Sequence, residues 1–268
     1  MKYLILIDME GIHGVVGVPM KGLTADLEEY TLATKNGVLE VNSAIKALYD
    51  FGNATEVMIW DNHAGKTNLD FSKVDPRAKQ LMVDYSKPRV QFLEDYSFDA
   101  AIFLGYHAKE GSNGVLAHTY NSSENQYLKI NGKQVGEFDF DARFIGEYGI
   151  PALFFASDDV AISQIKESIP DITTVVTKYA IDRNSANLRK SVDVINDIYN
   201  GVKLAVTKKI KPITFTFPCE FEIRYTRMEK AKAKYESVKP FISSLEYGED
   251  IHVLKMTANS SRDIKYFC

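Results

Sequence analysis

The sequence contains only two cysteines, Cys219 and Cys268, among its 268 residues. Two thiols are too few for a disulfide framework or a thiolate metal site, and their spacing matches no CxxC motif. No apolar run approaches the roughly 18 residues that a membrane span needs, and the apolar stretch near the N-terminus is too short for a signal peptide. These absences predict a cytoplasmic protein in a reducing compartment.

The chain also lacks a surplus of positive charge. It carries 32 Lys and Arg against 36 Asp and Glu, which gives a formal net charge of -4. Nucleic acid is therefore a poor ligand, and nothing indicates a membrane partner. With 45% hydrophobic and 25% charged residues, the composition is that of a globular protein, and we expect a small ligand.

Short apolar runs that end in polar side chains recur through the first 160 residues. They cover about residues 3–8, 56–61, 100–106 and 151–157, and the segment after the first has apolar residues at helical spacing. This alternation predicts an α/β fold with a mostly parallel sheet and helical crossovers. The dipeptide Asn131-Gly132, between two further short runs, predicts a β-hairpin.

The last third of the chain has a different pattern. We expect a helix over about residues 185–207, and the alternation from Thr214 to Tyr225 predicts antiparallel strands. The sequence therefore predicts a metal-binding α/β domain over residues 1–183 and a smaller mixed α+β subdomain over residues 184–268 packed on it. No linker rich in Gly, Ser or Pro separates the two.

Carboxylates and histidines cluster at the predicted strand ends. Asp8 and Glu10 follow the first strand, where residues two apart in an extended chain point to the same side. His63 and His107 follow later strands, and Glu137 ends a strand of the predicted hairpin. Taken singly, each is more often a structural acid or a core histidine. Their joint placement at one sheet edge favours a divalent-metal site.

The motifs that contain these residues resemble those of the M55 peptidase family of zinc-dependent D-aminopeptidases. The resemblance covers most of residues 1–185, and the C-terminal third matches less strongly. Four blocks carry it in order: Ile7-Asp8-Met9-Glu10-Gly11; Asp61-Asn62-His63; Leu104-Gly105-Tyr106-His107-Ala108 continuing through Gly114 to Thr119; and Asn131 to Glu137.

The resemblance implies two zinc ions per chain. Asp8 is similar to the family's bridging carboxylate. Glu10 and His107 complete the protein ligands of one ion, and His63 and Glu137 complete those of the other. The implied activity is removal of the N-terminal residue from short peptides or amino-acid amides, with D configuration expected by analogy. Family members form homo-oligomeric decamers, so the same assembly is expected here.

The resemblance also suggests a catalytic residue. His118 is similar to the family's catalytic histidine, with a role as nucleophile, base or acid. The residues that recognise the substrate amine are unknown, and four acids are candidates: Asp139, Asp141, Asp158 and Asp159.

Two other functions are compatible with the sequence. A metal-dependent phosphoesterase uses similar ligands, although no phosphate clamp is evident among the motif residues and only Lys66 and Lys109 lie nearby. A non-catalytic α/β module that binds a small ligand explains the fold equally well. It does not explain why five potential metal ligands recur at strand ends.

Overall fold

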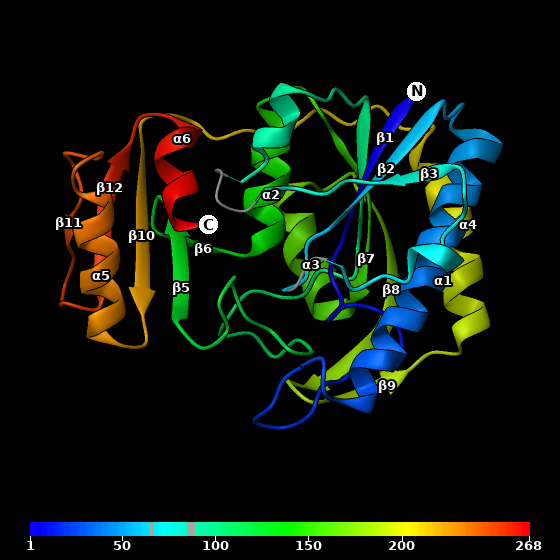
Figure 1. The fold of residues 1–268 in the computed structure, drawn as a ribbon, viewed down its shortest axis with the longest axis horizontal. Coiled ribbons are helices and arrows are strands. Elements are labelled where there is room, and N and C mark those ends of the chain that lie inside the picture. The colour runs from blue at the N-terminus through cyan, green and yellow to red at the C-terminus, as the bar shows by residue number, and fades with distance from the viewer. Residues whose placement is uncertain (65–66, 85–88) are drawn as a thin grey trace.

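Two β-sheets organise the chain. The structure is a computed structural model that describes residues 1–64, 67–84 and 89–268 (Figure 1). The first sheet has the order β3 (Ala78–Gln80), β2 (Glu56–Asp61), β1 (Lys2–Ile7), β4 (Ala100–Leu104), β7 (Ala152–Asp158), β8 (Thr173–Asp182), β9 (Ser185–Leu188). The second has the order β11 (Glu246–Tyr247), β12 (Val253–Ala258), β10 (Cys219–Tyr225), β5 (Asn125–Ile130), β6 (Lys133–Val135).

Helices connect and cover the strands. The α-helices are α1 (Glu28–Phe51), α2 (Glu137–Gly146), α3 (Asp159–Ser168), α4 (Ser191–Ala205), α5 (Met228–Val238) and α6 (Ser261–Ile264). Short 3-10 turns are η1 (Phe71–Lys73), η2 (Gln91–Glu94) and η3 (Lys265–Phe267). Although α1 has 24 residues, neither it nor another helix in the described ranges is long and apolar enough to cross a membrane.

The seven-stranded sheet is the middle layer of an α/β/α arrangement. Its strands run parallel except β9, which pairs antiparallel with β8. Along β1, Leu4 and Leu6 join the hydrophobic cluster that contains residues of α2 and α3. The alternating residues Tyr3, Ile5 and Ile7 join the cluster formed with α1 and α4. The predicted α/β fold with a mostly parallel sheet is confirmed.

The predicted hairpin is present, but it ends earlier than expected. Asn131 and Gly132 adopt φ angles of 49° and 77° between β5 and β6, as a tight two-residue turn requires. Glu137 does not end a hairpin strand. It is the first residue of α2, where its carboxylate, like that of Asp139, lies in the first turn, the end of a helix dipole that favours negative charge.

Sheet membership does not follow the predicted division between residues 1–183 and 184–268. Strand β9 and helix α4 come after that point, yet β9 pairs with β8 and α4 packs on α1. Strands β5 and β6 come before it, yet they belong to the second sheet, where β5 pairs with β10. The helix expected over residues 185–207 is therefore a strand followed by a shorter helix.

The segment before β10 also differs from the prediction. The expected strand over residues 214–225 begins only at Cys219, because the preceding residues cross from one sheet to the other. The amide of Phe215 donates to Glu147 Oε1 at 3.1 Å, and its ring lies 5.2 Å from that of Phe144 in α2. Alternation here reflects packing on α2 rather than pairing in a sheet.

An aromatic cluster joins α2 to the second sheet. Phe140 of α2 is fully buried, and its ring lies 6.1 Å from Phe221 of β10 and 6.4 Å from Phe215 of the crossing segment. Figure 1 shows α2 between the two sheets. Because α2 begins at Glu137, this packing also fixes one carboxylate of the candidate site described below.

Phe140→Ala should therefore destabilise the protein by about 3 to 5 kcal/mol, the usual loss for a buried phenylalanine. Phe241→Ala is a matched control because that side chain is 68% exposed, and it should cost about 1 kcal/mol or less. Chemical denaturation of both variants measures the difference. Equal losses would contradict the assigned role of Phe140.

Candidate metal centre and active site

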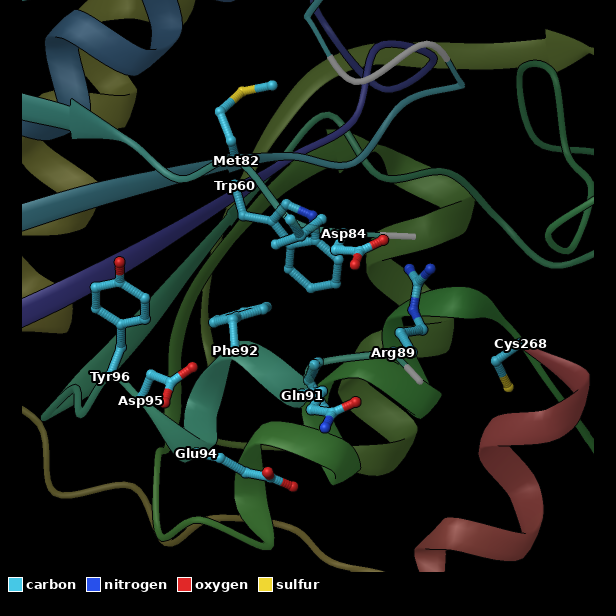
Figure 2. A pocket seen from close by; sticks show the side chains of 12 residues that line it. Trp60, Met82, Asp84, Arg89, Gln91, Phe92, Glu94, Asp95, Tyr96 and Cys268 are labelled. Atoms are coloured by element: carbon cyan, nitrogen blue, oxygen red, sulfur yellow. The ribbon is translucent and has the colours of Figure 1, made fainter. Parts of the chain in front are cut away.

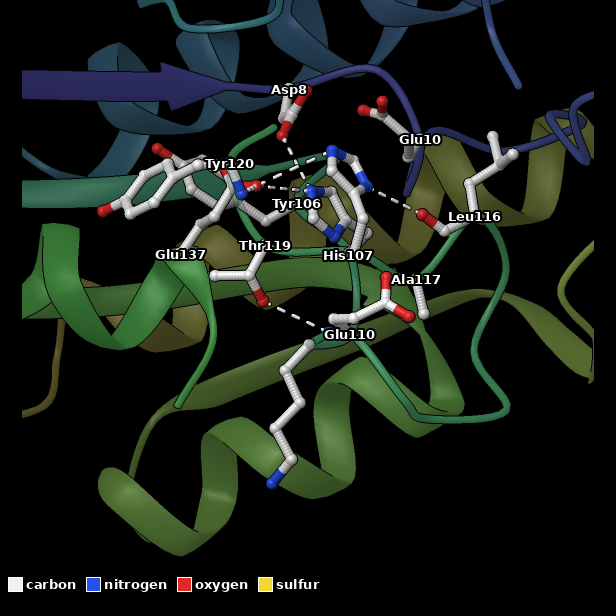
Figure 3. Close-up of polar contacts among 12 residues, drawn as sticks. Asp8, Glu10, Tyr106, His107, Glu110, Leu116, Ala117, Thr119, Tyr120 and Glu137 are labelled. Atoms are coloured by element: carbon white, nitrogen blue, oxygen red, sulfur yellow. Dashed lines mark hydrogen bonds and ion pairs between the residues drawn. The ribbon is translucent and has the colours of Figure 1, made fainter. Parts of the chain in front are cut away.

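Five predicted ligands meet at the carboxyl edge of the parallel sheet. Asp8 and Glu10 follow β1, His63 follows β2 and His107 follows β4, three strands that are neighbours in the sheet. Glu137 approaches from the start of α2, and Figure 3 shows it and Asp8 converging on His107. All five are at least 94% buried. The extended-chain argument for Asp8 and Glu10 is wrong, because β1 ends at Ile7 and a turn follows.

Asp8 lies between the two histidines. Its Oδ1 is 2.9 Å from His63 Nδ1, and its Oδ2 is 3.5 Å from His107 Nε2. Glu10 Oε2 lies 3.1 Å from His63 Nδ1, and Glu137 Oε1 lies 3.2 Å from His107 Nε2. The contacts therefore place Glu10 with His63 and Glu137 with His107, which exchanges the partners that the resemblance implied. The Asp8 carboxylate therefore contacts the histidine of each pair.

The donor set fits zinc. Two groups have potential ligand atoms within 4.8 Å of one another, Asp8, Glu10 and His63 in one and His107, His118 and Glu137 in the other. The Nδ1 of His107 donates to Ala108 O at 3.0 Å, so the buried Nε2, which forms no hydrogen bond, is the nitrogen that can bind a metal ion once it gives up its proton. Imidazole nitrogen and carboxylate oxygen are common zinc ligands.

Buried negative charge gives a second reason to expect a cation. Among the described residues, the only ion-pair partners of Asp8, Glu10 and Glu137 are histidines. Buried carboxylates are costly unless a cation or hydrogen bonds compensate them. This cluster therefore has the charge that a divalent metal site requires.

The pKa values of these carboxylates and histidines reflect their burial and the closeness of their charges. Burial raises the pKa of Asp8 to about 7, and the charge of Glu10 adds to the effect. Burial opposes ionisation of Glu137 as well, but the charge of His107 outweighs it and lowers the carboxyl pKa to about 2. Burial would lower the pKa of His107, yet Glu137 raises it to about 10. Protons on imidazoles thus balance these carboxylates, a role that a bound metal ion can take over.

His118 lies beside the candidate metal ligands. Its ring stacks on that of His107 with centroids 3.8 Å apart, and its Nε2 is 3.7 Å from Glu137 Oε1. Burial lowers the pKa of His118, and the charge of His107 lowers it further. Because Nδ1 donates to Leu116 O at 2.8 Å, the neutral ring presents Nε2 as a proton acceptor. The side chain can therefore exchange a proton in the cleft.

Two contacts hold the segment before His118. The amide of Leu116 donates to Arg183 O at 2.8 Å, and the guanidinium of Arg183 donates to Ala117 O. Leu116 has a positive φ of 51°, a conformation that is uncommon for a leucine. Arg183 comes from the β8–β9 turn, and no motif in the sequence indicated it.

A cleft of about 490 Å³ opens over these residues. Its floor is acidic, and cations that the sequence analysis did not single out also line it. The described lining includes Asp8, Glu10, His63, His118, Glu137, Tyr120, Asn121, Lys21, Arg89 and Arg183.

The four acids proposed to recognise the substrate amine are not among the described residues that line this cleft. Asp139 accepts hydrogen bonds from Arg143 and Ser168. Asp158 accepts from two backbone amides, including Ala161 N, and Asp159 accepts from Ala180 N. Asp141 is fully buried.

Asp141 instead forms a hydrogen-bond network behind the candidate metal ligands. It accepts from Arg89 Nη2 at 2.7 Å, from the Tyr106 hydroxyl at 2.7 Å and from Asn62 Nδ2 at 3.3 Å. Asn62 and Tyr106 each directly precede a histidine of the centre. Asp141 therefore ties the ends of β2 and β4 together. Asn62 and Tyr106 were within the quoted motifs, whereas Arg89 carried no sequence signal.

Arg89 lines this cleft and also a second cavity of about 310 Å³, whose lining Figure 2 shows. Its guanidinium lies 5.2 Å from the Trp60 ring, which lines that cavity, and 4.8 Å from the Tyr120 ring, which lines the cleft. Contacts of this kind stabilise a desolvated guanidinium. Arg89 therefore forms a wall of the cleft with its charge balanced by Asp141.

Close backbone approaches explain two glycines of the motifs. Gly105 has a φ of 70°, and a Cβ there would lie 2.0 Å from Asp8 O. A Cβ on Gly11 would lie 2.2 Å from Tyr106 O. The amide of Gly11 also donates to Gly105 O at 2.6 Å. Only glycine at both positions lets the segments after β1 and β4 pack this closely.

The chain is similar to known D-aminopeptidases in sequence and in fold. The sequence profile of the D-aminopeptidases, peptidase family M55, matches residues 1–250. A D-aminopeptidase from Bacillus subtilis (strain 168) is 31% identical over 218 residues, which are 80% of this chain and 77% of that protein. The structure of the Zn-dependent D-aminopeptidase DppA from Bacillus subtilis, a self-compartmentalizing protease, matches with a TM-score of 0.87 at 25% identity, covering 99% of this chain and 94% of that one. The resemblance noted in the motifs is confirmed, and the chain belongs to the D-aminopeptidase family, peptidase family M55.

Proposed function

We propose that this chain is a zinc-dependent aminopeptidase that binds two zinc ions and releases the N-terminal residue of short peptides or amino-acid amides. The observation that carries the proposal is the position of Asp8, whose two oxygens face different histidines. Glu10 and His63 would hold one ion, and Glu137 and His107 would hold the other. The names of both Bacillus subtilis relatives support the activity, and the name of one supports the metal.

When bound, zinc supplies Lewis acidity for the scissile carbonyl and for the attacking water. The chain's own contribution to proton transfer centres on His118. Its Nε2 can take a proton from the nucleophile and return it to the leaving amine. Glu137, whose Oε1 is 3.7 Å from that nitrogen, would stabilise the protonated ring. The Nδ1 bond to Leu116 O keeps the ring in one orientation throughout.

The substrate proposal follows the charges of the cleft. Carboxylates of the floor, beside the metal ions, would attract the positively charged amine of a peptide. We propose D configuration for the released residue, because the matching sequence and the matching structure are both named D-aminopeptidase. The proposed location is the cytoplasm, which follows from the low cysteine content.

The phosphoesterase and binding-module alternatives gain no specific support. Lys109 directs Nζ toward Gln134 O, 3.5 Å away, and is not among the described residues of the cleft. Lys66 lies outside the described residues. Arg89 lines the cleft, but its charge is balanced by Asp141. A module with purely structural acids gives no reason to bury three carboxylates against histidines.

Asp8→Asn tests the metal centre directly. We expect about two zinc ions per chain in the wild-type protein and a loss of at least one in the variant, because a neutral amide cannot join two cations as a carboxylate does. Elemental analysis of protein purified without chelator gives the content. Asp139→Asn is the matched control, since Asp139 is buried outside the cleft, and it should keep the wild-type content. Full zinc in Asp8→Asn would contradict the bridging role.

His118→Gln tests the proton-transfer role. The variant should keep its zinc and lose about 10² to 10⁴-fold in kcat, the usual contribution of a general acid or base. Turnover of D- and L-alanine amide and of the corresponding dipeptides provides the rate and the stereochemical preference. His252→Gln is the control, because His252 contacts Tyr225 O in the second sheet and should remain fully active. Normal turnover by His118→Gln would remove His118 from the mechanism.

We further propose that the chain assembles with copies of itself, which the name of one relative, a self-compartmentalizing protease, supports. The proposed number of ten chains comes from the resemblance to the family. Light scattering coupled to gel filtration should give a mass of about ten chains in a closed symmetric assembly. A single-chain mass at micromolar protein concentration would contradict this proposal and leave the metal centre unaffected.

A further inference from the structure

A buried lysine lies beneath the segment that follows β1. Lys178 of β8 is fully buried, and its Nζ donates to Glu10 O at 2.5 Å and to Ile12 O at 2.8 Å. The neighbouring Thr177 is also fully buried, and its hydroxyl donates to Gly11 O at 2.6 Å. Three consecutive carbonyls of the metal-binding segment therefore receive hydrogen bonds from two adjacent side chains.

A local irregularity of β8 makes this double contact possible. In a regular strand, adjacent side chains point to opposite faces of the sheet. The pairing of β7 with β8 shifts here, with Ser157 opposite Val176 and Asp158 opposite Lys178. Thr177 is thus the extra residue of a β-bulge, a feature that re-aims side chains and is frequent beside active sites. The bulge lets the side chains of both Thr177 and Lys178 donate hydrogen bonds to the turn that follows β1.

The turn needs such donors. Strand β1 ends at Ile7, so the carbonyls at residues 10–12 lie beyond its ladder. Ile12 O also accepts from Val15 N at 3.3 Å, and buried carbonyls without partners are costly. An apolar packing residue could not satisfy them. Burying an ammonium group costs free energy. At this position the Lys178 ammonium can donate to the carbonyls of Glu10 and Ile12 at once.

We propose that Thr177 and Lys178 are positioning residues of the metal centre. By fixing the backbone of residues 10–12, they hold the Glu10 carboxylate against His63, 3.1 Å away. Residues that do not touch the metal but orient its ligands commonly control metal affinity. The assignment rests on the proposed zinc function, and it predicts an effect on metal binding that a purely structural role does not.

The same segment provides a matched control. Asn36 of α1 donates from Nδ2 to His13 O at 2.9 Å, and Asn36 is also buried. Asn36→Leu therefore removes one buried side-chain bond to a carbonyl of this segment, three residues away from the ligand Glu10. It should reduce stability to a similar degree as Thr177→Val without moving a ligand.

The experiment compares Thr177→Val, Lys178→Met and Asn36→Leu with the wild-type protein. Zinc affinity is measured by competition with a chromophoric chelator, and the stability of the zinc-free protein is measured by thermal unfolding. We expect Thr177→Val and Lys178→Met to weaken zinc binding at the site of Glu10 and His63 about 10 to 100-fold, as for other residues that orient metal ligands. Asn36→Leu should retain the wild-type affinity at a comparable loss of Tm.

Wild-type zinc affinity in both Thr177→Val and Lys178→Met would overturn the proposal, as would an equal loss in Asn36→Leu. If Lys178→Met does not fold, the zinc affinity of the isosteric variant Thr177→Val tests the proposal by itself. A wild-type protein that takes up no zinc contradicts the proposed function, and with it this assignment. A wild-type protein that binds zinc while the variants match it contradicts the assignment alone.

Discussion

Three carboxylates buried at one edge of a parallel sheet are the constraint on which the rest of this structure depends. Asp8, Glu10 and Glu137 have only histidines as ion-pair partners among the described residues. Such a cluster repels itself unless protons or metal ions compensate the charge. The surrounding fold therefore has to hold like charges together at short distance, and several of its less obvious features serve that purpose.

Rigid support comes from elements that carry no ligand. Asp141 of α2 joins the ends of β2 and β4 through Asn62 and Tyr106, and it binds Arg89 at the wall of the cleft. The bulge in β8 supports the segment after β1 from the other side. Support of this kind would hold the candidate ligands close to the geometry that a metal ion needs, which would lower the cost of binding it.

The two sheets contribute to the candidate site in different ways. Four of the five candidate ligands follow strands of the parallel sheet, whose carboxyl ends meet at one edge. The second sheet contributes packing through the aromatic cluster around Phe140 and so fixes α2, whose first residue is Glu137. The position of one candidate ligand, Glu137, therefore depends on a part of the chain, including β10, that holds none of the five candidates.

Sequence by itself determined the strands that end at the site, because apolar runs followed by polar residues are local patterns. It therefore located Asp8, Glu10, His63 and His107, and the motif resemblance identified the family. Only the tertiary structure decided which carboxylate contacts which histidine, and that the extra residue of β8 is Thr177. It also showed Asp141 bound to Arg89 rather than facing the cleft. These features depend on strand register and on contacts between segments far apart in the chain, which no local pattern encodes.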